Sequence, residues 1–91
     1  MIIDNGETCA TVRPALSVAR RAIVRAENGS GTFLWYAFRG LNSLIDAAEN
    51  DQHGHLIQKV LRSDYEEALS LRSRVIDLAK ELGVSLNMWG K

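Results

Sequence analysis

The segment 33–49, FLWYAFRGLNSLIDAAE, constrains the fold most, because its apolar residues repeat with the period of an α-helix. At about 100° per residue they form one continuous stripe along the helix. The stripe consists of Phe33, Leu34, Ala37, Phe38, Leu41, Leu44, Ile45 and Ala48. A helix with one apolar side buries that side against other elements, so this segment predicts one member of a packed helical domain.

Two further segments have the same period. Residues 12–27 predict a first helix, with Pro14 in a first turn, where a missing N–H is tolerated. The sequence Asn28-Gly29-Ser30-Gly31 ends that helix in a tight turn. Residues 55–82 predict the longest helix, and Gly83 is its expected C-cap.

The third helix has an open alternative. Ser63-Asp64-Tyr65-Glu66 has the pattern of a capping box, which favours a break near Ser63 into segments 55–62 and 64–82. Arg72 falls on the apolar side in either case. It therefore needs an acidic partner or a path to solvent, and we expect it to help specify the register of the bundle.

The two ends of the chain fit an all-α fold with an extended arm. Residues 1–11 predict that N-terminal arm and 84–91 a C-terminal tail, in which Trp89 packs back onto the bundle or onto a partner. The whole chain of 91 residues is expected to be one small up-down bundle of three main helices. The alternative is an α+β fold, in which a hairpin at Asn5-Gly6 pairs with a short strand at Val84–Met88.

Composition limits the location and partners of the protein. Eleven basic residues balance eleven acidic residues, so the whole molecule offers no bulk attraction to nucleic acid or anionic lipid, and little charge repulsion opposes self-association. A single cysteine, Cys9, favours a reducing compartment. The chain shows no signal-peptide pattern and no membrane-spanning run. We therefore predict a cytoplasmic location without membrane contact.

A row of polar and aromatic residues lies opposite the apolar stripe of segment 33–49. Trp, Tyr and Arg dominate binding hot spots, so the row predicts a surface that binds another protein. An antiparallel pair of these helices would bring Arg39 of one chain toward Asp46 of the other about a two-fold axis. The sequence thus predicts a small regulatory interaction module, a homodimer, with candidate binding residues Trp35, Tyr36, Arg39, Asn42 and Asp46.

An alternative function comes from the polar side of the first helix. Residues 8–26 carry four arginines and no acidic residue, a pattern that also suits contacts with phosphates. The candidate nucleic-acid-binding residues are Arg13, Arg20, Arg21 and Arg25.

Catalysis is not expected. The acidic residues occupy helix starts or polar helix sides, and no nucleophile–base arrangement or phosphate-binding glycine loop is present. His53 and His55 are the one candidate metal pair, but a stable site needs three or four ligands. We therefore predict no enzyme activity, no metal, no cofactor and no small-molecule substrate.

Overall fold

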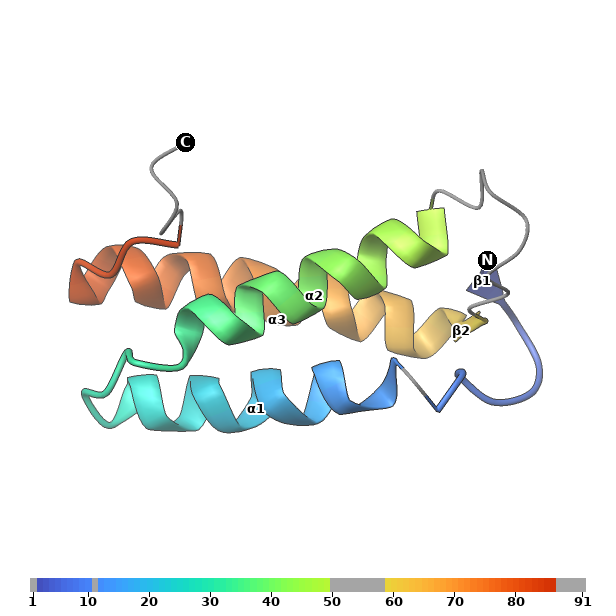
Figure 1. Cartoon of the computed structure of the whole chain (residues 1–91), viewed down its shortest axis with the longest axis horizontal. Coiled ribbons are helices and arrows are strands. Elements are labelled where there is room, and N and C mark those ends of the chain that lie inside the picture. Colours follow the sequence, from blue (N-terminus) through green and yellow to red (C-terminus); the bar gives the residue numbers. More distant parts are fainter. Residues whose placement is uncertain (1, 11, 50–58, 87–91) are drawn as a thin grey trace.

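The computed structural model describes residues 2–10, 12–49 and 59–86, in which three helices pack against one another (Figure 1). This arrangement confirms the predicted helical bundle. The elements in chain order are β1 (Ile2–Ile3), α1 (Arg13–Glu27), α2 (Leu34–Glu49), β2 (Val60–Leu61) and α3 (Arg62–Leu82).

Helix α1 forms as its periodicity predicts. Pro14 lies in the first turn, and Val12 precedes the helix without a side-chain cap. At the other end, the Asn28 side chain donates a 2.8 Å hydrogen bond to the Val24 carbonyl, which satisfies one terminal acceptor. The buried side consists of Leu16, Ala19, Ala22, Ile23 and Ala26.

Helix α2 begins one residue later than the sequence indicates, and this changes the position of Phe33. Phe33 lies in the turn before the helix and is 39% exposed, so its place in the buried stripe was predicted wrongly. Phe38 is half-buried. The rest of the stripe forms the buried side as predicted: Leu34, Ala37, Leu41, Leu44, Ile45 and Ala48.

Helix α3 runs from Arg62 to Leu82, so it begins within two residues of the predicted segment 64–82, and residues 55–82 do not form one continuous helix. Residues 60–61 were expected in a helix and instead form β2, because Val60 is fully buried and its backbone pairs with β1. Residues 55–58 lie outside the described part of the chain. Asp64 does occupy the first turn, and Gly83 ends the helix at φ +68°, a left-handed conformation that glycine adopts without strain.

The N-terminal arm crosses the end of the bundle where α3 begins. Strand β1 pairs in parallel with β2, with Ile2 opposite Val60 and Ile3 opposite Leu61. The backbone N–H of Cys9 also donates a 2.7 Å hydrogen bond to the Lys59 carbonyl. The arm is therefore held by backbone hydrogen bonds at both ends of its course.

These contacts rule out the alternative α+β fold, in which the N-terminal segment forms a hairpin. The strand at the N-terminus pairs with the segment before α3, whereas Val84–Leu86 forms no strand and packs partly against the core. A Cβ added at Gly31 would lie 2.7 Å from the Val84 side chain, so the C-terminal segment passes tightly over the turn between α1 and α2. Met88 and Trp89 lie outside the described residues.

Candidate protein-binding surface

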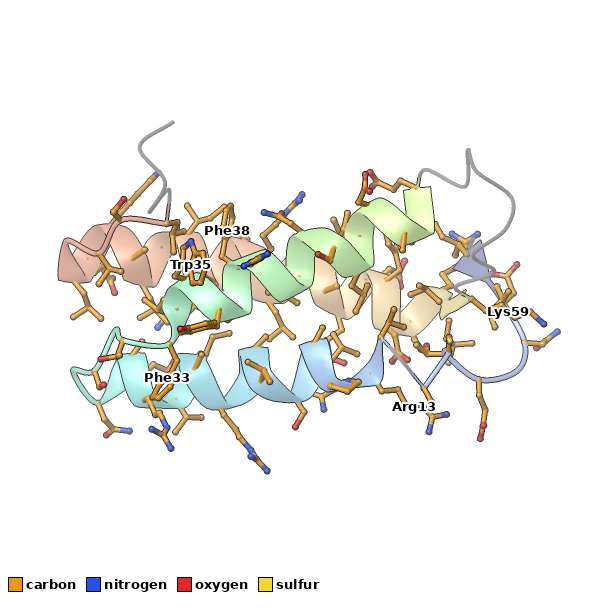
Figure 2. The ribbon with its side chains drawn as sticks, in the orientation of Figure 1. Arg13, Phe33, Trp35, Phe38 and Lys59 are labelled. Atoms are coloured by element: carbon orange, nitrogen blue, oxygen red, sulfur yellow. The ribbon has the colours of Figure 1, made fainter. Side chains whose placement is uncertain are left out.

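Three aromatic residues surround the start of α2. Tyr36 is 58% exposed, and its ring lies 4.9 Å from that of Trp35, edge to face at 74°. The Phe33 and Tyr36 rings are 6.5 Å apart. Figure 2 shows Phe33 on the side of α2 that faces α1, with Trp35 and Phe38 on the other side. The start of α2 thus presents apolar rings to solvent on both sides.

Two arginines lie over these rings. The guanidinium carbon of Arg39 is 5.4 Å from the centre of the Trp35 ring, and that of Arg25 is 4.7 Å from the centre of the Phe33 ring. Each distance is within the range of a cation–π interaction. The predicted neighbours Trp35, Tyr36 and Arg39 are therefore brought together, and Arg25 joins them from α1.

Trp35 belongs partly to the fold and partly to the surface. Its side chain is half-buried, and it lines a shallow depression together with Arg39, Phe38 and Leu86. Leu86 comes from the segment after α3, so the chain's own C-terminal part supplies one wall. Tyr36, rather than Trp35, is the more exposed aromatic residue of the predicted row.

The far end of the predicted row is polar and contacts α3. The Asn42 side-chain oxygen accepts a 3.0 Å hydrogen bond from Arg72, so this amide has a role inside the bundle. The same bond gives Arg72 a polar partner on the apolar side of α3. Asp46 is exposed and lines a small hollow with Asn42 and Arg72.

A tyrosine–carboxylate contact lies at the polar end of α2. The Tyr65 hydroxyl donates a hydrogen bond to the Glu49 carboxylate. This hydrogen bond, together with partial removal from water and the nearby negative charge, raises the pKa of Tyr65 above its ordinary value of 10.0. The contact joins the last turn of α2 to the first turn of α3.

An apolar groove, which the sequence did not predict, lies between α1 and α2. The groove is open to solvent and has a volume of about 680 Å³. Ala15 and Gly40 meet where the two helices come closest. Val18 lies on the arginine-rich side of α1 and is 44% exposed. An apolar residue at this otherwise polar position is the sequence feature that could have indicated the groove. The lining residues are Val12, Pro14, Ala15, Val18, Phe33, Tyr36, Gly40, Ser43 and Leu44.

The four arginines of α1 do not form one surface. Arg13 pairs with Glu7 of the arm at 3.2 Å. Arg20 makes two hydrogen bonds, of 2.7 and 2.6 Å, to the carboxylate of Glu67 on α3. Arg21 and Arg25 instead line a hollow that continues the groove beside Phe33. Two of the candidate phosphate-binding residues are therefore held by carboxylates, and the other two border the apolar groove.

The metal and membrane predictions can be compared with the structure only over the described residues. His53 and His55 lie outside the described residues. Within residues 2–10, 12–49 and 59–86, no group of three His, Cys, Asp or Glu side chains is placed to hold a metal ion. No helix in these same ranges is both long and apolar enough to cross a bilayer.

Comparisons with known proteins add no family or relative. Neither the scan against protein-family models nor the searches of curated proteins and of solved structures found a significant match to this chain.

Proposed function

We propose that this chain is a small non-catalytic protein–protein interaction module that forms a homodimer through the exposed side of α2. The observation that carries the proposal is the exposure of Tyr36 beside the stacked pair Trp35 and Arg39. Tyrosine, tryptophan and arginine supply most of the binding energy in known interfaces, and rings with restricted mobility lose little entropy on binding.

Charge placement favours a second copy as the partner. Arg39 and Asp46 are seven residues apart, so they lie on one side of α2, about 10 Å apart along its axis. An antiparallel pair of α2 helices about a two-fold axis brings each Arg39 toward Asp46 of the other copy. Such a self-complementary arrangement is what an isologous dimer interface requires.

A charge reversal tests this proposal. The molar mass of the wild-type protein in solution is measured by light scattering over a wide range of protein concentration. Arg39→Asp should weaken the dimer, because it places like charges opposite each other. The double variant Arg39→Asp/Asp46→Arg should restore it, since the pair is then reversed but still complementary.

Trp35→Ala is a second variant, and it separates binding from folding. We expect loss of the dimer with unchanged helical circular dichroism. A large loss of helicity would assign Trp35 to the core. A wild-type protein that stays monomeric at all concentrations would contradict the homodimer.

A further inference from the structure

The groove between α1 and α2 runs along both helices, which lie side by side (Figure 1). One wall follows α1 from Val12 through Val18, and Arg25 stands at the end of the same side. The other wall extends from Phe33, just before α2, to Leu44. From residue 12 to residue 25 the groove and its adjoining hollow span about 20 Å along the axis of α1.

One end of this groove carries positive charge. Arg21 and Arg25 are exposed and border the hollow that continues the groove beside Phe33. No acidic residue lines the groove or this hollow. The Arg25 guanidinium lies 4.7 Å from the centre of the Phe33 ring, a contact that holds it beside the groove without neutralising its charge.

The other two arginines of α1 differ in this respect. Arg13 pairs with a carboxylate of the arm, and Arg20 pairs with a carboxylate of α3. Among the described residues, neither Arg21 nor Arg25 forms a salt bridge. The uncompensated charges of α1 therefore lie together at one end of an apolar groove, where a ligand with carboxylates would balance them.

The shape of the groove indicates the kind of ligand. A small molecule or an alkyl chain needs a pocket that encloses most of its surface, whereas this groove is open to solvent. An amphipathic helix needs only a groove that takes its apolar row, with the polar side left in water. A helix of about 14 residues is about 20 Å long, which matches the length of the groove and its hollow.

We infer that the α1–α2 groove is a second binding site, which takes an acidic amphipathic helix of another protein. The apolar row of that helix lies between α1 and α2, and its carboxylates meet Arg21 and Arg25. Arg39 instead borders a depression with Trp35, which Figure 2 shows on the other side of α2 from Phe33. The inference goes beyond the proposed homodimer and does not depend on it.

Two synthetic helical peptides test the charge at this end. Both have about 14 residues and the same row of leucines, and they differ only in one terminal turn, which contains glutamates or lysines. Fluorescence anisotropy measures their binding at a low protein concentration. The glutamate peptide should bind at least about tenfold more tightly than the lysine peptide. Arg21→Glu/Arg25→Glu should reverse this preference, because the end of the groove is then negative.

Two pairs of variants provide matched controls. Arg25→Glu and Arg39→Glu cause the same change in net charge, and each removes an arginine that lies over an aromatic ring. Arg25→Glu should weaken binding of the glutamate peptide about tenfold, and Arg39→Glu should leave it unchanged. Val18→Gln, in the groove, should weaken it about fivefold. Val24→Gln, at an exposed position outside the lining, should have no effect.

Circular dichroism shows that each variant is folded. Equal effects of Arg25→Glu and Arg39→Glu would assign the binding to net charge alone and overturn the inference. Absence of binding by the glutamate peptide, or equal binding of both peptides, would also overturn it. Tighter binding of dodecanoate than of the glutamate peptide would assign the groove to an anionic alkyl chain instead.

Light scattering separates this inference from the homodimer. Self-association that Val18→Gln and Arg25→Glu both weaken would place a second copy in the groove and overturn the binding of another protein there. A wild-type monomer that still binds the glutamate peptide would contradict the proposed homodimer and support the groove as a separate site.

Discussion

The Thr8 hydroxyl donates a 2.5 Å hydrogen bond to the carboxylate of Asp64, which lies 56 positions further along the chain. The same hydroxyl oxygen accepts a 2.9 Å hydrogen bond from the backbone N–H of Leu61. Thr8 is the buried polar residue of the described core, 4% exposed. One side chain thus satisfies both a backbone group and a carboxylate at the start of α3, and it holds the arm there.

Replacement of this hydroxyl should destabilise the fold. Thr8→Val keeps the shape of the side chain but leaves the Leu61 N–H and the Asp64 carboxylate without this partner. Loss of a partner from a buried polar group costs about 1–3 kcal/mol. Urea denaturation measures the change in the free energy of unfolding. Thr32→Val is the control, because Thr32 is exposed and its replacement should change stability by less than about 0.5 kcal/mol.

Replacement of two glycines by alanine should change the stability of the fold in opposite directions. Gly40→Ala should stabilise the monomer by up to about 1 kcal/mol, because the added methyl group fits against Ala15 and the helix gains propensity. Gly31→Ala should destabilise the fold by about 1–3 kcal/mol, because its methyl group would lie 2.7 Å from Val84. Thermal unfolding of both variants at low protein concentration gives the comparison. A destabilised Gly40→Ala would mean that the fold itself requires this glycine.

The contact between Tyr65 and Glu49 predicts a pH dependence. The pKa of Tyr65 is raised in the folded protein, chiefly by the hydrogen bond to Glu49. The stability from this contact is therefore complete below the pKa of the unfolded chain, near 10.0, and is lost as the pH rises through the higher folded pKa.

Absorbance titration of the phenol checks this expectation. Tyr36→Phe leaves Tyr65 as the one tyrosine of the chain, so its ionisation is read without overlap. Addition of Glu49→Gln removes the charged acceptor and should return the pKa of Tyr65 toward its ordinary value. The same pKa in both backgrounds would show that the carboxylate is not its cause.

The nucleic-acid alternative makes a separate prediction. Because Arg13 and Arg20 pair with Glu7 and Glu67, we expect no measurable affinity for duplex DNA at low salt. Fluorescence anisotropy with labelled DNA measures this. Binding that weakens steeply with salt and disappears in Arg20→Ala/Arg21→Ala would instead support the arginine surface as a phosphate-binding site.

Local periodicity was sufficient to predict the helices. The apolar spacing of Leu34 to Ala48 placed α2 within one residue of its start, and Gly83 marked the end of α3. These signals act over a few residues, so a single sequence contains them. Phe33 was assigned to the wrong environment, because periodicity alone does not show where the first helical turn begins.

The contacts between distant segments could not be predicted from local periodicity. The pairing of Ile2 with Val60 involves two strands of two residues each, too short for an alternating pattern to register. The groove depends on how close α1 approaches α2 at Ala15 and Gly40. The open space beside Gly40 likewise follows only from three-dimensional packing.

The pairing of β1 with β2 imposes an order on assembly during translation. Ile2 and Ile3 leave the ribosome before the backbone that pairs with them, which is synthesised about sixty residues later. At about 5–20 residues per second, this leaves several seconds in which α1 and α2 can already pack through nearby contacts. Strand β1 can therefore dock only after α1 and α2 have been made, because its docking depends on synthesis of the chain through the start of α3.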